Sequence, residues 1–266
     1  VFRTGLNYQL AEATYIRASW GQGYRFPSMA ELFISTNQSG LEIYPNPQLK
    51  PEGGWSSEIG IKQGVKTGKW MGYIDIAAFI MEYDDMMEFS FGQWAQNIPD
   101  PNDPNESLNF YGLGFKSVNV GETRISGVEL SLNGQGKINP NLTINVIAGY
   151  TYMNPISLDL DHVYAESVYG KGLTYGNSSS DSTMLKYRYK HIAKADIEVI
   201  YKKISLGGSV RYNSFMKNID LIFTQPLLES PEIGITGINE AREKFEDGDI
   251  IIDLRGGYKI TKIARL

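Results

Sequence analysis

Residues 189–213 decide the fold, and they read YKHIAKADIEVIYKKISLGGSVRYN. Up to Tyr201, the odd positions are mostly apolar with a tyrosine at each end, whereas the even positions are largely charged. After Lys202-Lys203 the alternation returns, with apolar residues at every second place from Ile204 to Tyr212. Successive side chains of a strand point to opposite faces. The segment therefore predicts a hairpin with one apolar and one charged face, and places Arg211 diagonally near Asp196.

The same period of two recurs along most of the chain. Its other apolar faces lie within 2–8, 14–20, 59–65, 74–80, 128–132, 142–152 and 250–260. Together with the two strands of the hairpin at 189–213, these seven segments predict nine strands, and a tenth that begins just after Thr261-Lys262. The strand that starts at Trp70 keeps its pattern as far as Phe91, so we expect it to project well past the others.

The connections between these strands are alternately short and long. The short ones have about two to five residues, and the long ones are Tyr24–Gly54, Gly92–Gly114, Pro155–Lys186 and Lys217–Gly248. Strict alternation puts every long loop at the same end of an up-and-down meander. Outer-membrane barrels have this arrangement, with short periplasmic turns and long extracellular loops. The strand pattern alone also fits a soluble β-sandwich, but a sandwich gives loop lengths no reason to alternate.

Composition narrows the class of protein further. The mean hydropathy is −0.27, and the sequence holds no apolar run long enough for a transmembrane helix. The apolar stretches instead have the length of a tilted strand crossing, and several end in an aromatic residue. A net charge of −5 argues against a nucleic-acid partner. The absence of cysteine excludes disulfides and thiolate metal sites.

Three local motifs resemble those of TonB-dependent receptors, in the family's order. They are GYRFPS at 23–28 followed by ELF at 31–33, NPQLKPE at 46–52 followed by EIGIK at 58–62, and SGVEL at 126–130. The second motif is the most specific of the three. The motif residues are Arg25, Pro27, Asn46, Pro47, Leu49, Lys50, Pro51, Glu52, Glu58, Gly60, Gly127 and Glu129.

We expect these motif residues to have architectural roles. Pro27 and Pro51 fall at strand ends, where a missing N–H costs least. Glu52 is suited to holding a turn, and Glu58 falls on the lumen parity with Gly60. None of them is expected to contact a ligand.

The resemblance implies an all-β, up-and-down transmembrane barrel of about 22 strands, preceded by a plug domain and a short TonB-binding box. Residues 1–266 are then a partial barrel of nine to ten strands with two open edges, and the plug and final strand lie outside this chain. The implied function is TonB-energised uptake of a scarce, bulky nutrient such as a siderophore, a corrinoid or an oligosaccharide. The implied location is the outer membrane of a Gram-negative bacterium.

The implied partners are outer-membrane lipid, the protein's own plug, the TonB complex and the nutrient, with no nucleic acid and no cofactor. The alternative is a small structural or adhesive outer-membrane barrel without active transport. The sequence has no nucleophile elbow and no phosphate loop, so we expect no enzyme activity.

Aromatic residues in the long loops are the candidate ligand contacts, because flat aromatic surfaces suit ring-containing nutrients. They are Tyr44, Trp94, Phe110, Tyr111, Tyr164 and Tyr169, and Tyr175 shares the same setting. The lumen charges, among them Asp196 and Arg255, are expected to pair with one another or with the plug. The two histidines, His162 and His191, are too far apart in the pattern for a metal site. The DPNDPNE run at 100–106 is expected to form turns rather than a calcium loop.

Overall fold

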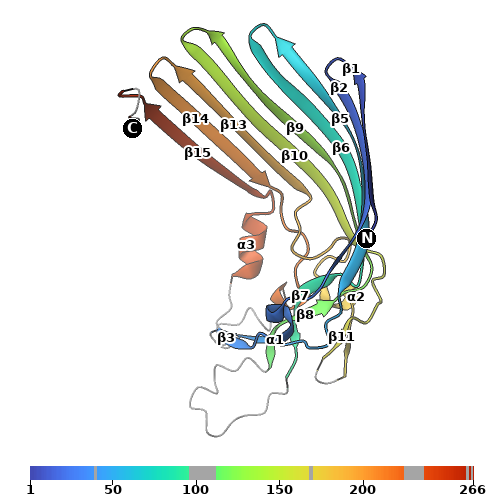
Figure 1. Cartoon of the computed structure of the whole chain (residues 1–266). Helices are drawn as coiled ribbons and strands as arrows, with labels where there is room; N and C mark the ends of the chain where they lie inside the picture. Colours follow the sequence, from blue (N-terminus) through green and yellow to red (C-terminus); the bar gives the residue numbers. More distant parts are fainter. Residues whose placement is uncertain (39–40, 96–111, 168–169, 225–236, 262–263, 265) are drawn as a thin grey trace.

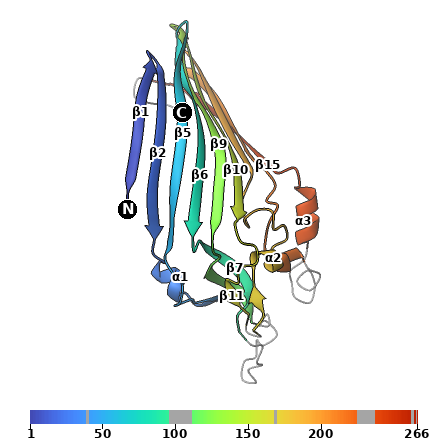
Figure 2. The ribbon, with the colours of Figure 1, turned by 90° about the vertical axis from the view of Figure 1, so that its right-hand side faces the viewer.

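A computed structural model describes residues 1–38, 41–95, 112–167, 170–224, 237–261, 264 and 266. Its main feature is an open, curved wall of long antiparallel strands (Figure 1). The short turns lie at one end of this wall, and every long connection leaves from the other end, as Figure 2 also shows. The predicted partial up-and-down barrel is therefore confirmed.

Nine strands form the wall, and sequence neighbours pair with each other throughout. They are β1 (Arg3–Ala11), β2 (Thr14–Arg25), β5 (Glu52–Thr67), β6 (Trp70–Asp84), β9 (Thr123–Asn139), β10 (Leu142–Ser157), β13 (His191–Tyr201), β14 (Ile204–Asn213) and β15 (Asp249–Tyr258). β1 and β15 are the two edges of this sheet, so the barrel is not closed. Leu266 exchanges two backbone hydrogen bonds with Tyr258, which shows that the chain has turned back there, as expected for a tenth strand.

The outward face of the wall carries exposed apolar side chains from edge to edge. Those between 46 and 85% exposed include Leu6, Ile59, Ile76, Ile197, Leu206, Ile252 and Leu254. An apolar band of this extent is unfavourable in water and suits the lipid face of a barrel. The other parity on the same strands holds charged residues such as Arg17 and Asp196, and this is the lumen face.

The hairpin predicted at residues 189–213, formed by β13 and β14, has the predicted register. Tyr201 lies opposite Ile204, and Lys202 occupies the left-handed region with φ of 54°. Two residues therefore suffice to reverse the chain, as in the favoured tight hairpin turns. Gly68, with φ of 58°, has the same role between β5 and β6.

The prediction that one strand runs from Trp70 to Phe91 is wrong. β6 ends at Asp84, because Asp85 takes φ of 50° and the facing strand is broken at Gly121, with φ of 86°. The chain then re-pairs as a separate hairpin of β7 (Met87–Gln93) and β8 (Leu113–Asn119). The second long connection is consequently 85–122, rather than 92–114.

A second sheet is built from two of the long connections. Its order is β3-β4-β8-β7, where β3 (Thr36–Gln38) and β4 (Leu41–Tyr44) come from the first loop. The loops also contain α1 (Met29–Phe33), the two-stranded β11 (Ala165–Glu166) and β12 (Gly172–Leu173), α2 (Tyr175–Ser178), η2 (Leu221–Thr224) and α3 (Ile238–Lys244). No helix among the described residues is long and apolar enough to cross a membrane.

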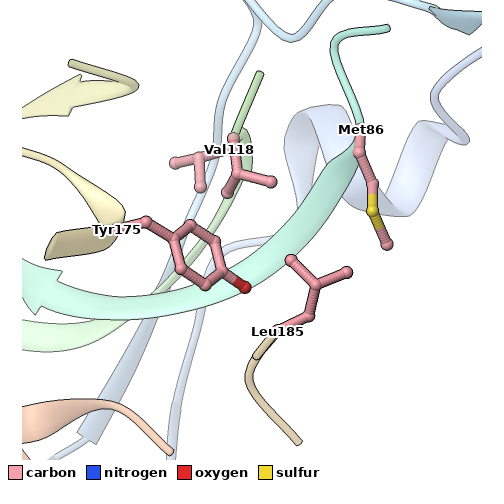
Figure 3. Packing of buried hydrophobic residues seen from close by; sticks show 5 residues of the cluster. Met86, Val118, Tyr175 and Leu185 are labelled. Atoms are coloured by element: carbon pink, nitrogen blue, oxygen red, sulfur yellow. The ribbon is translucent and has the colours of Figure 1, made fainter. Parts of the chain in front are cut away.

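Almost all of the buried hydrophobic residues lie in the loops; among the described residues, Ala77 of β6 is the one in the wall. One cluster joins Met86, Val118, Val120, Tyr175 and Leu185 (Figure 3), and a second joins Phe91 and Leu113 with Phe115, Ile222 and Phe223 around them. These residues come from the connections 85–122, 158–190 and 214–248. We call the described residues of these three connections up to 224 the loop head, because shared cores hold them together.

Substitution at two adjacent wall residues tests which face meets lipid. Leu130 and Ser131 are neighbours on β9 and point to opposite faces, outward and toward the lumen. In the full-length protein, we expect Leu130→Arg to cost about 2–4 kcal/mol of folding free energy near the bilayer centre, and Ser131→Arg to cost little. Urea unfolding in lipid vesicles measures both. Equal costs, or a larger cost for Ser131→Arg, would contradict the assigned facing.

Candidate functional site

The motif residues Arg25 and Glu52 form an ion pair where β2 and β5 leave the wall. Arg25 Nε donates to Glu52 Oε1 at 2.9 Å, and Arg25 Nη1 donates to Glu31 Oε1 at 2.7 Å. Glu31 in turn accepts the Ser28 N–H at 2.7 Å, which closes the capping box of α1. Although partial burial opposes it, hydrogen bonding from Ser28 and Arg25 lowers the pKa of Glu31. The motif GYRFPS…EL thus fixes a short helix to the end of the wall.

Glu52 also holds the hairpin that follows β6. Its second oxygen, Oε2, accepts the N–H of Met87 at 2.9 Å, at the first residue of β7. One carboxylate therefore connects three segments: the end of β2 through Arg25, the start of β5, and the start of β7. A hydrogen bond to a charged group contributes more than a neutral one. The sequence predicted that Glu52 holds a local turn, whereas this hydrogen bond joins residues 35 positions apart in the sequence.

The rest of the NPQLKPE motif lies along the same hairpin. Asn46 Nδ2 donates to the carbonyl oxygen of Ser117 at 2.8 Å. The backbone of Lys50 exchanges hydrogen bonds with the side chain of Asn119, at 2.9 and 3.0 Å. Leu49 is 6% exposed. The motif therefore joins the first long loop to β8, and Pro51 directly precedes β5 as expected for a strand end.

On the lumen face, Arg17 spans three strands of the wall. From β2 it donates to Glu58 of β5 at 2.7 Å and to Asp75 of β6 at 2.6 Å. It lies across Gly60, where a Cβ atom would come within 2.8 Å of the Arg17 Cζ atom. The missing side chain of Gly60 thus leaves space for the guanidinium to lie flat over β5 and reach Asp75 on β6. Lys62 adds a 3.4 Å contact to Asp75.

The same arrangement recurs at the other edge of the wall. Arg255 of β15 lies over Gly207 of β14 and binds both oxygens of Asp196 on β13, at 2.5 and 2.7 Å. In both cases the arginine faces the glycine, and the aspartate faces the residue two places further along the glycine's strand. Arg211 binds Asp253 instead of its diagonal neighbour Asp196, at 3.1 Å. These lumen charges therefore neutralise one another within the wall.

A buried ion pair lies in the loop head. Lys186 Nζ and Asp220 Oδ1 are 2.5 Å apart, and their side chains are 2% and 1% exposed. The carboxylate also accepts hydrogen bonds from the Tyr187 hydroxyl at 2.7 Å and from the Phe91 N–H at 3.2 Å. Ser178 accepts a further Lys186 proton at 2.9 Å. Burial and the neighbouring Asp220 carboxylate raise the pKa of Tyr187, so its hydroxyl stays a donor.

The candidate ligand aromatics have different settings. Trp94 donates its indole N–H to the Gly114 carbonyl at 3.0 Å, and Lys116 lies over its ring. Tyr164 donates to Ser178 at 2.9 Å within the loop head. Tyr44 is partly buried on β4, and burial, followed by the effect of Glu42, raises the pKa of its hydroxyl. Tyr175 is 1% exposed and packs the head together. Phe110, Tyr111 and Tyr169, like the run 100–106, lie outside the described residues.

The two histidines lie in different elements, His191 on β13 and His162 in the connection 158–190. His191 is on the outward face, where its Nδ1 is 2.8 Å from the Tyr150 hydroxyl. His162 covers Gly121 in the third connection. In the part of the chain that the structure describes, no group of three or more His, Asp or Glu residues is placed to hold a metal ion.

A shallow recess of about 480 Å³ lies beside the Arg25–Glu52 pair. Its floor is formed by Gly21, Gly23 and Gly54, and its sides include Met81 and Tyr83. A Cβ atom at Gly23 would meet nothing within 4 Å.

The sequence did not single out Arg17, Asp75, Lys186 and Asp220 as contacts across strands or loops. For the Arg17–Asp75 pair, the only signal in the sequence was the presence of glycines on the lumen parity.

The comparisons with known proteins agree on the fold. Residues 1–266 match the family model described as TonB dependent receptor-like, beta-barrel. The hemoglobin and hemoglobin-haptoglobin-binding protein A of Haemophilus influenzae is 22% identical over 213 residues, covering 71% of this chain and 18% of that protein. The chain thus spans less than a fifth of that relative's length.

Solved structures of receptors and transporters share the wall. The copper transporter OprC matches with a TM-score of 0.53 and 16% identity, covering 98% of this chain and 31% of that one. A double mutant of the Serratia marcescens hemophore receptor HasR, in complex with its hemophore HasA and heme, gives a TM-score of 0.53 and 17% identity, covering 98% and 34%. The siderophore receptor PiuA from Acinetobacter baumannii gives 0.52 and 17%, covering 98% and 29%. At these identities the likeness establishes the fold alone.

The glycine beneath Arg17 can be tested against a glycine with open space. We expect Gly60→Val to displace the guanidinium and to destabilise the full-length protein by about 1 kcal/mol, as for a partly exposed ion pair. Gly23→Val should be neutral or slightly stabilising, because valine favours strands. Urea unfolding in vesicles measures both. Adding Arg17→Ala to Gly60→Val should cost nothing more; a fully additive double variant would contradict the coupling.

Removal of the Glu52 carboxylate should loosen β7 at its start. A hydrogen bond to a charged group contributes roughly 1.5–3 kcal/mol, so in Glu52→Ala the exchange protection around Met87 should fall by roughly ten- to hundredfold. Hydrogen–deuterium exchange of the full-length protein in detergent measures this. Glu246→Ala, at an exposed site between α3 and β15, is the matched control. Unchanged protection at Met87 would show that Glu52 does not hold the hairpin.

Proposed function

Because this chain belongs to the TonB-dependent receptor β-barrel family, we propose that it is part of an outer-membrane receptor for TonB-energised uptake of a scarce, bulky nutrient. Barrels of this family are outer-membrane proteins of Gram-negative bacteria, and its members are receptors and transporters rather than enzymes. The outward apolar band supports the same location for this chain. Outer-membrane lipid, the receptor's own plug, the TonB complex and the nutrient are the partners.

The observation that carries the proposal is the contrast between the wall and the loop head. On the lumen face, Arg17, Arg211 and Arg255 each pair with carboxylates of nearby strands, so these charges face a conduit already neutralised. At the opposite end from the short turns, the loops form an ordered head with its own buried core. A structural barrel needs no such head, whereas a receptor needs a surface that is fixed before its ligand arrives.

The nutrient class we propose is an iron-carrying compound, either a ferric siderophore or haem. Relatives of this fold include a siderophore receptor, a hemophore receptor and a hemoglobin-binding protein by name. Haem iron is commonly held by histidine. His162 is the one histidine of this chain on the loop side, since His191 contacts Tyr150 on the outward face. Trp94 and Tyr44 are partly exposed and both lie beside Gly114, and flat rings of this kind suit either compound. Corrinoids and oligosaccharides are the other classes to test.

Growth of the source bacterium tests the function. A strain lacking the receptor gene, grown with one candidate nutrient as the limiting source, should fail on that nutrient and recover when the full-length gene is restored. Deletion of the TonB gene should abolish the same growth. Growth that is unaffected by either deletion on ferric siderophores, haem, corrinoids and oligosaccharides would favour the alternative, a structural or adhesive barrel.

A further inference from the structure

We propose that Glu88 is a pH-sensitive latch between β7 and the connection 158–190. With its carboxyl group protonated, the two segments stay closed on each other; when the group ionises, the closed arrangement is weakened. The proposal draws on the proposed function only to place the loop head outside the cell.

The geometry of the carboxyl group carries this inference. The Glu88 side chain is 8% exposed, and its Oε2 atom accepts a hydrogen bond from the Tyr175 hydroxyl at 2.6 Å. Tyr175, at the start of α2, is 1% exposed and belongs to the core in Figure 3. The Oε1 atom is buried, and no hydrogen bond reaches it from the residues that the structure describes. A buried carboxylate with one oxygen that accepts no hydrogen bond is costly, and the neutral carboxyl group costs less because it carries no charge.

The charged and titratable groups around Glu88 compensate its ionised form only in part. Arg188 Nη2 is 3.9 Å from Oε1, beyond hydrogen-bond distance, and is 37% exposed. Lys186 forms its ion pair with Asp220, at 2.5 Å, and not with Glu88. The Asp220 carboxylate also places a second negative charge near Glu88. The Tyr187 hydroxyl is likewise bound to Asp220. The carboxyl group therefore lies close to two cations, but only Arg188 forms an ion pair with it, and at 3.9 Å that pair contains no hydrogen bond.

The direction of the pH effect follows from this setting. Burial raises the pKa of Glu88; Tyr175, Arg188 and Lys186 oppose the rise, and Asp220 adds to it. A group whose pKa is raised in the closed state holds its proton more tightly there than in the open state. Between the ordinary glutamate pKa and the raised one, the closed state therefore binds more protons and loses stability as pH rises. The closed head is strongest in mild acid.

Trypsin reports the latch directly, because it cleaves after lysine and Lys186 is 2% exposed when the head is closed. Lys171, which is exposed in the same connection, supplies an internal reference for protease activity at each pH. In the full-length receptor in detergent, we expect the ratio of cleavage at Lys186 to cleavage at Lys171 to rise with pH. The rise should not exceed about tenfold per pH unit, the limit for one proton.

In Glu88→Gln the ratio should stay low and flat, whereas Glu166→Gln, at an exposed site, should behave like the wild type. An equal rise in Glu88→Gln, a flat wild type, or a ratio that falls as pH rises would overturn the latch. If Glu88→Gln does not fold, Tyr175→Phe decides. Loss of the tyrosine hydrogen bond raises the carboxyl pKa further, so the rise should persist and move to higher pH. No growth or uptake is measured, so failure here is distinct from failure of the proposed function.

Discussion

Backbone hydrogen bonding in hydrocarbon is the constraint on which the rest of this structure depends. No water is available in the membrane interior, so every N–H and C=O of a crossing strand must pair with a neighbouring strand. The seven inner strands of the wall meet this requirement with an antiparallel neighbour on each side, whereas the edge strands β1 and β15 are paired on one side. A sheet with one face in lipid must then keep its apolar side chains on a single parity. The period of two seen from Leu6 to Leu254 is the direct result.

That constraint leaves the lumen parity free to carry charge, and the wall uses it to connect strands. Arg17 and Arg255 each reach over a glycine to an aspartate two strands away. A larger residue at Gly60 or Gly207 would occupy the space of the guanidinium. Glycine in a strand is normally unfavourable, and here the resulting ion pairs offset that cost. Both arginines are therefore paired with a carboxylate on the lumen surface.

Beyond the membrane, water is available again and the chain changes its means of stabilisation. The loop head has a dry core and the buried Lys186–Asp220 pair, which connects the loop before β13 to the loop after β14. Removing one partner from such a pair costs roughly 3–5 kcal/mol, so the loops are expected to behave as one body. Glu52 and Asn119 then connect this body to the first loop and the wall. The motif NPQLKPE is therefore a joint between wall and head.

The sequence by itself determined the nine strands, their facing, the tight turn at Lys202 and the end of the barrel from which the loops leave. Each of these follows from a local pattern with period two, or from the length of a connection. Only the tertiary structure decided that β6 stops at Asp84, that Tyr175 is buried, and that Lys186 meets Asp220. Alternation cannot register a change of backbone direction such as that at Asp85, because residues on both sides keep the same parity. Nor can it pair loop residues 34 positions apart, since their contact depends on how separate loops fold together above the membrane.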